Sequence, residues 1–188
     1  MSDVPAPVPR RPLVAAPRRA TLRFMLGSPL HAVALGFGSG LSPRAPGTVG
    51  TLWAWLAFLV LQPHLGVWGW AGLLVAGFVL GCWACTATAR RLGLADPGCI
   101  VWDEVIAFWL VLWLVMPAGV LAQGIAFALF RYFDAAKPGP VAWADALFKP
   151  RHGPDRALQI GWTQGLGIML DDLVAALCTL LVIALWIF

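Results

Sequence analysis

Long runs of apolar residues, separated by short polar or proline-containing stretches, dominate the chain after residue 50. Each run is typical of a helix, and two of them end at Pro63 and Pro117, as expected because proline ends or kinks a helix. The runs cover residues 51–62, 66–86, 100–116, 118–133 and 167–188. The pattern therefore predicts an all-α helical bundle.

The chain before the first run has a different character. Residues 1–20 contain five Pro and four Arg, which favours a disordered basic tail. Residues 21–35 are mildly amphipathic. Residues 36–50, GFGSGLSPRAPGTVG, contain five Gly and two Pro and are predicted to form a loop.

Composition places this bundle in a membrane. Hydrophobic residues make up 60% of the 188 residues and charged residues only 12%, whereas soluble domains have about 45–50% apolar and about 25% charged residues. We expect residues 21–188 to form a single membrane-embedded domain, because the length leaves no room for a second one. The first run is shorter than the roughly 20 residues that cross a bilayer, so it is either a partial span or begins inside the loop.

The basic residues divide the links between the runs into two kinds. All 13 Lys and Arg lie before residue 51, between the second and third runs, or within residues 131–156. The links around Pro63 and Pro117 contain none. Since basic links stay on the cytoplasmic side, this alternation predicts about five membrane segments, a cytoplasmic N-terminus and an external C-terminus.

Acidic residues converge on the same predicted face. Asp103 and Glu104 open the third run, Asp134 closes the fourth, and Asp171 and Asp172 open the fifth. Carboxylates gathered at one end of a bundle repel each other unless a cation is present, and oxygen ligands favour Mg²⁺. We therefore predict that all five are catalytic or metal-binding. Local pairing with Arg or Lys is the structural alternative.

The glycine-rich loop offers partners for a phosphate. Ser42 and Thr48 supply hydroxyls, Arg44 supplies a positive charge, and the glycines let backbone N–H groups approach an anion. If Thr48 or Thr51 caps the first helix, the helix N-terminus adds to this site. A flexible loop without a ligand is the alternative.

Two further cations flank Asp134. Arg131 and Asp134 are three residues apart, so they share one face of a helix, and Lys137 follows at the same interval. A metal carboxylate between two cations suits a phosphate monoester, so Arg131 and Lys137 are predicted to bind phosphate. A simple basic flank with a local ion pair is again the alternative.

Four stretches carry a resemblance to a known family. They are GFGSGLSPRAPGTVGT (36–51), IVWDE (100–104), FRYFDAAKPGP (130–140) and GLGIMLDD (165–172). In identity, order and spacing they resemble the phosphatidylglycerophosphatase A family of bacterial membrane enzymes, over about residue 35 to the C-terminus. The resemblance implies a Mg²⁺-dependent lipid phosphatase in the bacterial inner membrane, with its active site facing the cytoplasm. It implies that phosphatidylglycerol phosphate, an anionic phospholipid, is converted to phosphatidylglycerol. The family's functional groups fall on Ser42, Arg44, Thr48, Asp103, Glu104, Arg131, Asp134, Lys137, Asp171 and Asp172.

Two other functions remain open from the sequence. A phosphotransferase that uses CDP-linked lipids also gathers Asp and Mg²⁺ at a cytoplasmic face, but its D-x2-D-G-x2-A-R pattern is absent. A transporter with an acidic site would place carboxylates near the bilayer centre, often in repeated halves. Besides the lipid substrate, the expected partner is the bilayer. Nucleic acid is not expected, because the basic residues do not cluster with aromatic residues.

Overall fold

The computed structural model describes residues 20–148 and 161–187, and this part of the chain is helical without a strand. The predicted tail at residues 1–20 lies outside the described residues except for Ala20. The elements are α1 (Leu22–Leu26), α2 (Pro29–Ala34), the 3₁₀ helix η1 (Gly36–Leu41), α3 (Pro46–Leu61), η2 (Gln62–His64), α4 (Val67–Leu92), α5 (Trp102–Val115), α6 (Val120–Ala136), α7 (Pro140–Phe148) and α8 (Trp162–Ile187).

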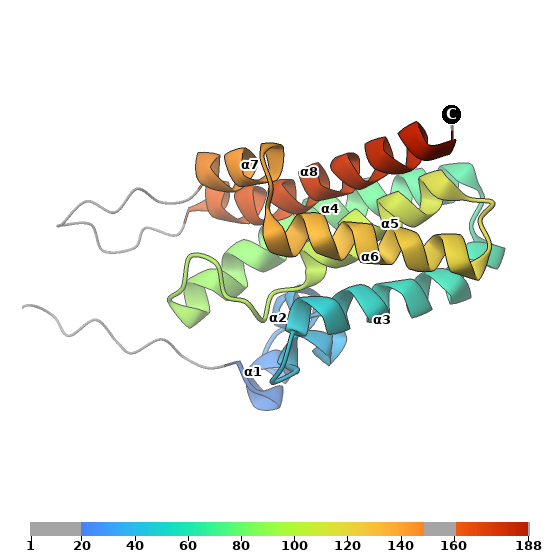
Figure 1. The fold of residues 1–188 in the computed structure, drawn as a ribbon. Coiled ribbons are helices and arrows are strands. Elements are labelled where there is room, and N and C mark those ends of the chain that lie inside the picture. The colour runs from blue at the N-terminus through green and yellow to red at the C-terminus, as the bar shows by residue number, and fades with distance from the viewer. Residues whose placement is uncertain (1–19, 149–160, 188) are drawn as a thin grey trace, which may run out of the picture.

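The long helices lie side by side along one axis (Figure 1). α3, α5 and α8 begin at one end of the bundle, here called the near end, and run toward the far end that holds the C-terminus. α4 and α6 run back from the far end to the near end. α5 lies among the others, in contact with α3, α4, α6 and α8. The short elements α1, α2 and η1 gather beside the start of α3 at the near end.

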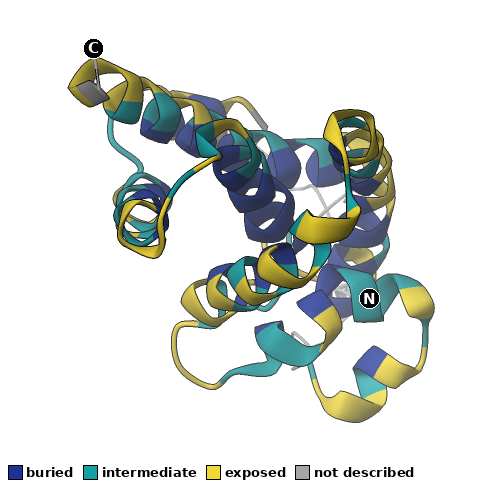
Figure 2. Cartoon of the chain, turned by 90° about the vertical axis from the view of Figure 1, so that its right-hand side faces the viewer, coloured by how far each residue is buried: buried dark blue, intermediate teal, exposed yellow. Residues whose placement is uncertain are grey.

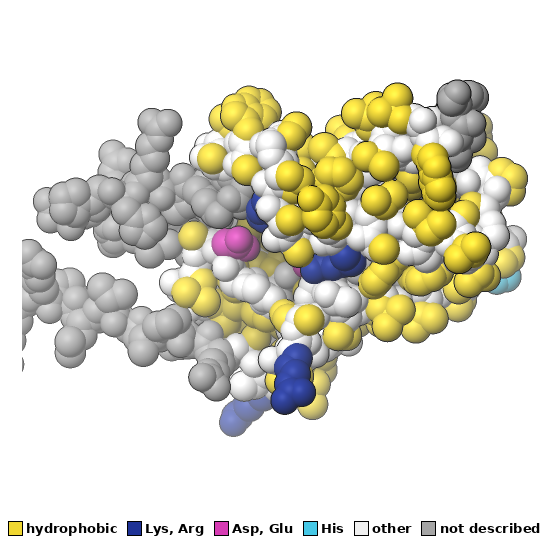
Figure 3. All heavy atoms as spheres, viewed as in Figure 1, with side chains coloured by type: hydrophobic (Ala, Val, Ile, Leu, Met, Phe, Trp, Pro, Cys, Tyr) yellow, Lys and Arg dark blue, Asp and Glu magenta, His cyan; other side chains and the backbone are white. Residues whose placement is uncertain are grey.

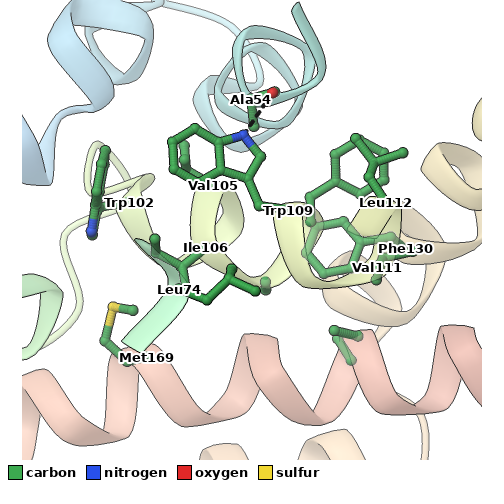
Figure 4. Packing of buried hydrophobic residues seen from close by; sticks show 14 of the residues in the cluster. Ala54, Leu74, Trp102, Val105, Ile106, Trp109, Val111, Leu112, Phe130 and Met169 are labelled. Carbon is green, nitrogen blue, oxygen red and sulfur yellow. Dashed lines mark hydrogen bonds between the residues drawn. The ribbon is translucent and has the colours of Figure 1, made fainter. Parts of the chain in front are cut away.

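The core forms around α5. The helices turn their buried faces toward one another and their exposed faces outward (Figure 2). Phe108 and Leu112 on α5 are fully buried against the neighbouring helices. Trp109 packs in the same core and donates from its indole Nε1 to the carbonyl oxygen of Ala54 on α3, at 2.8 Å (Figure 4). A buried indole N–H needs such a partner, so this bond fixes how α3 lies on α5.

Glycines set the distance between α4, α5 and α8. A Cβ atom on Gly81 of α4 would lie 2.6 Å from the Met169 sulfur and 2.8 Å from Trp102 Cδ1. A Cβ atom on Gly165 of α8 would lie 2.1 Å from the Cys82 carbonyl oxygen. Small residues that let backbones approach closely are typical of helix packing in membranes. They bring the start of α5 and the first half of α8 close together.

Apolar side chains cover much of the outer surface, and the charged side chains visible in Figure 3 lie among them toward the near end. α4 and α8 are each long and apolar enough to cross a membrane. α3, α5 and α6 have 16, 14 and 17 residues. At 1.5 Å per residue they are about 21–26 Å long, less than the roughly 30 Å of a hydrocarbon core. The all-α prediction is confirmed for the described residues, and two helices rather than five meet the length criterion.

The predicted boundaries need correction in several places. The loop at residues 36–50 contains η1 and the first turn of α3, which begins at Pro46 because proline suits the first helical position. α4 continues beyond residue 86 until Gly93, whose positive φ of 73° closes the helix. α8 begins at Trp162 rather than residue 167. α7, a nine-residue helix packed on α8, was not predicted.

Candidate functional site

Two acidic residues lie in the first turn of α5, at the near end. Asp103 and Glu104 are only 9% and 8% exposed. The preceding Val101 is held by its N–H, which donates to the Ala34 carbonyl oxygen at 2.9 Å. A Cβ atom on Gly50 would lie 2.7 Å from Val101 Cβ, so α3 also packs directly on this segment. α2 and the start of α3 thus fix the position of the first turn of α5. At this helix N-terminus the helix dipole favours negative charge.

A third carboxylate reaches this pair from α8. Asp172 is 4% exposed, and one ligand atom from each of Asp103, Glu104 and Asp172 lies within 4.8 Å of the others. We call these three residues the acidic cluster. Asp172 is the eleventh residue of α8, about 15 Å along the helix, rather than at its start as the sequence suggested. The extra turns lie on the near-end side of the cluster.

The acidic cluster fits a divalent cation. Asp103 Oδ1, Glu104 Oε2 and Asp172 Oδ2 are buried, and none has a hydrogen-bond partner among the described residues. Buried carboxylate oxygens without partners are costly, and three carboxylates in one place repel each other. A hard cation with oxygen ligands removes both costs. The residues present therefore suit a metal site.

Arg131 on α6 links this cluster to α3. Its Nη1 forms an ion pair and hydrogen bond with Asp134, lies 3.8 Å from Glu104 Oε1, and donates to the Thr51 hydroxyl at 3.2 Å. The pairing of Arg131 with Asp134 confirms that these two residues share one helix face. Arg131 thus contacts groups on α3, α5 and α6 at once, and its charge offsets part of the negative charge of the cluster.

Gly47, in the first turn of α3, packs against this arrangement. A Cβ atom there would lie 2.4 Å from Glu104 Oε1 and 3.0 Å from Arg131 Nη2. No side chain larger than hydrogen fits without displacing one of these groups. The glycine-rich segment therefore lies directly against the side chains of Glu104 and Arg131.

Lys137 and Asp171 form a second bridge at the near end. Lys137 Nζ donates to Asp171 Oδ2 at 2.6 Å, joining the end of α6 to α8. Lys137 reaches this position because it ends α6 with a positive φ of 44°, which turns the chain before Pro138. Its partner Asp171 directly precedes Asp172, a member of the acidic cluster, in the sequence.

The predicted loop residues Ser42, Arg44 and Thr48 are not part of the acidic cluster. Arg44 and Thr48 are exposed, and the Ser42 hydroxyl donates to the Arg44 carbonyl oxygen at 2.8 Å. Neither Thr48 nor Thr51 caps α3, so the condition for a capped phosphate site at this helix start is not met. Ala45 is the cap residue, without a side-chain bond, and the Thr51 hydroxyl donates to the Gly47 carbonyl oxygen at 2.8 Å.

The comparison with known families agrees with this geometry. Residues 32–187 match the model of the family described as Phosphatidylglycerophosphatase A. The chain belongs to this family. A phosphatidylglycerophosphatase A of Haemophilus influenzae is 35% identical over 161 residues, which cover 86% of this chain and 90% of that protein. A phosphatidylglycerophosphatase A of Escherichia coli is 36% identical over 156 residues, covering 83% and 82%. No solved structure matches the chain.

The family match confirms the resemblance carried by the four sequence stretches, since it includes all of them. The sequence did not single out Gly47 as a site residue, and it named Thr51 only as a possible cap of the first helix. The Thr51 hydroxyl accepts a hydrogen bond from Arg131, and a Cβ atom on Gly47 would lie 3.0 Å from Arg131 Nη2. The position of Gly47 directly after Pro46, at a helix start within a glycine-rich stretch, was the available signal.

Proposed function

We propose that this chain removes the phosphomonoester group from phosphatidylglycerol phosphate, giving phosphatidylglycerol and inorganic phosphate. The observation that carries the proposal is the buried acidic cluster in a chain of the phosphatidylglycerophosphatase A family. Both bacterial relatives are named for this activity. A CDP-lipid phosphotransferase and a transporter are not favoured by the family match.

We further propose that the metal is Mg²⁺ and that Asp103, Glu104 and Asp172 hold it. Bound there, the ion supplies Lewis-acid polarisation of a phosphoryl oxygen. Asp134 and Asp171 remain predicted as further ligands. In this structure each pairs with a cation, Arg131 or Lys137, which supports an additional role in orienting these cations.

The phosphate is proposed to bind between the acidic cluster and the start of α3. Lys137 and Arg44 supply positive charge, and Ser42 and Thr48 supply hydroxyls. Arg131 contributes as well, because its buried Nε has no hydrogen-bond partner among the described residues. Charge-assisted hydrogen bonds of this kind replace the hydrogen bonds to water that a doubly charged phosphate loses when it binds.

The proposed location is the bacterial inner membrane, with the near end in the cytoplasm. The alternating directions of the long helices and the basic residues at the near end support a multi-pass arrangement. Reporter fusions after residues 64, 95 and 119 test it. We expect cytoplasmic signal at residue 95 and external signal at residues 64 and 119. An external signal at residue 95 would contradict the topology.

Phosphate release by the purified full-length protein tests the activity. In mixed micelles with Mg²⁺, phosphatidylglycerol phosphate should be hydrolysed well above a phosphatidylinositol phosphate control. A mock preparation from cells that do not express the chain, purified identically, shows how much phosphate release comes from contaminants. Equal release by both preparations would exclude the proposed function.

A further inference from the structure

An apolar groove of about 220 Å³ lies on the flank of the bundle between α4, α5 and α8. Leu74 and Ile106 form its buried floor, with 8% and 2% exposure. Val75 and Val79 on α4 form an outer wall and are 67% and 61% exposed. All lining side chains are apolar, so the groove suits a hydrocarbon chain and not a polar ligand.

The groove and the acidic cluster share two helices, α5 and α8. Ile106 and Leu110, which line it, follow Asp103 at three and seven residues on α5 and therefore lie on the same side of that helix. Leu173, also in the lining, directly follows Asp172 on α8. Both helices run from the near end toward the far end (Figure 1).

The groove thus starts about one turn beyond the cluster and extends away from it toward the far end. Figure 4 shows Leu74 and Ile106 together between α5 and α8. A lipid whose phosphate lies at the acidic cluster must direct its acyl chains the same way, into the apolar part of the bundle surface. Because α5 and α8 carry residues of both the acidic cluster and the groove, one lipid molecule can contact the cluster with its phosphate and the groove with an acyl chain.

We propose that this groove binds the first part of one acyl chain of the lipid substrate while the phosphomonoester lies at the acidic cluster. The proposal rests on the proposed lipid phosphatase function, and it assigns the enzyme a preference for acylated over deacylated substrate. The exposed wall of Val75 and Val79 faces the surrounding apolar phase, so a chain enters from the side without leaving that phase.

Filling the groove from its outer wall tests the proposal. Val75→Trp and Val79→Trp add bulk at exposed positions and leave the buried floor intact. Val60→Trp on α3, at a site 68% exposed and outside the lining, is the matched control. For each protein, kcat/KM is measured with dipalmitoyl phosphatidylglycerol phosphate and with its deacylated head group, and thermal melting confirms folding.

We expect each groove variant to lower kcat/KM for the diacyl substrate about tenfold, the size of effect that a few methylene contacts produce. The wild type should hydrolyse the deacylated head group more slowly than the diacyl substrate. The groove variants should hydrolyse the deacylated head group as fast as the wild type does. Val60→Trp should change neither. An equal loss of kcat/KM on both substrates, or an unchanged kcat/KM for the diacyl substrate in both groove variants, would overturn the proposed acyl-chain site. A wild type inactive on both substrates would instead overturn the proposed function itself.

Discussion

Gln123 and the acidic cluster are buried toward opposite ends of the bundle and differ in how far their hydrogen-bonding capacity is used. At the far end, Gln123 on α6 is 4% exposed and fully engaged. Its Oε1 accepts from Trp55 Nε1 at 2.7 Å, and its Nε2 donates to the Ala118 carbonyl oxygen at 2.8 Å. At the near end, Asp103, Glu104 and Asp172 are equally buried, yet each keeps an oxygen without a partner among the described residues.

We expect Gln123 to contribute mainly to stability and the acidic cluster mainly to activity. A neutral, satisfied group such as Gln123 joins α3 to α6 at little electrostatic cost and contributes to stability. Three carboxylates buried together without a cation are costly, which is why we propose that the acidic cluster holds one. Substitutions at the near end should therefore lower activity more than stability, and substitutions at the far end should do the reverse.

The largest effect is expected for Asp172→Asn. Loss of one charged ligand should lower phosphate release about a thousandfold or more, because several kcal/mol of charge stabilisation are removed. Thermal melting without metal should be unchanged or higher, because one of three repelling carboxylates is neutralised. Phosphate assays and melting on the same preparation check both halves. Activity above a tenth of wild type would place the metal elsewhere.

Loss of Lys137 or Arg44, the cations proposed to bind phosphate, should have a smaller effect. Lys137→Ala and Arg44→Ala should each lower kcat/KM about ten- to a hundredfold, since a charge-assisted hydrogen bond contributes about 1.5–3 kcal/mol. Arg23→Ala, at an exposed position on α1, is the control for general attraction to an anionic surface. Assays in neutral micelles at moderate salt suppress that attraction. Losses equal to that of the control would mean that neither cation contacts phosphate.

Gly47→Ala tests the contact between α3 and the cluster. The added methyl group must displace Glu104 or Arg131, so kcat/KM should fall about tenfold, an effect expected from a small misplacement of reacting groups. Gly72→Ala on α4, where a Cβ atom meets nothing within 4 Å, is the matched control. It should keep full activity and melt slightly higher, because alanine favours a helix. Equal activity of the two variants would show that the close contact has no role in catalysis.

The smallest effect on activity is expected at the far end. Gln123→Leu leaves the partly buried Trp55 N–H without an acceptor, so the folded state should lose about 1–3 kcal/mol. The kcat/KM of the folded protein should not change. Thermal melting and phosphate assays below the melting temperature check this. A loss of activity comparable to that of Gly47→Ala would remove the distinction between the two ends.

The sequence could predict which helix ends meet. Apolar runs and the alternation of basic and neutral links place the starts of the third and fifth runs and the end of the fourth on one face. The structure brings Asp103, Glu104 and Asp172 together there. The three-residue spacing of Arg131 and Asp134 also predicted their shared face, because helix periodicity alone determines it.

Other features depend on tertiary structure and could not be predicted. The Lys137–Asp171 pair joins two helices and requires the left-handed turn at Lys137, which no local pattern indicates. The contact of Gly47 with Glu104 depends on how closely α3 lies on α5. The position of Asp172 within α8 was misjudged because polar residues before residue 167 concealed the first turns of that helix.

We propose that the acidic cluster binds a divalent cation, and direct titration tests this binding. Metal-free, full-length protein in detergent is titrated with Mn²⁺, a paramagnetic substitute for Mg²⁺, and the free ion is measured by electron paramagnetic resonance. Phosphate release is measured on the same samples. We expect saturable Mn²⁺ binding that Mg²⁺ displaces, that is at least about tenfold weaker in Asp103→Asn, and that phosphate release follows. Mn²⁺ binding as tight in Asp103→Asn as in the wild type, or full phosphate release in excess chelator, would contradict it.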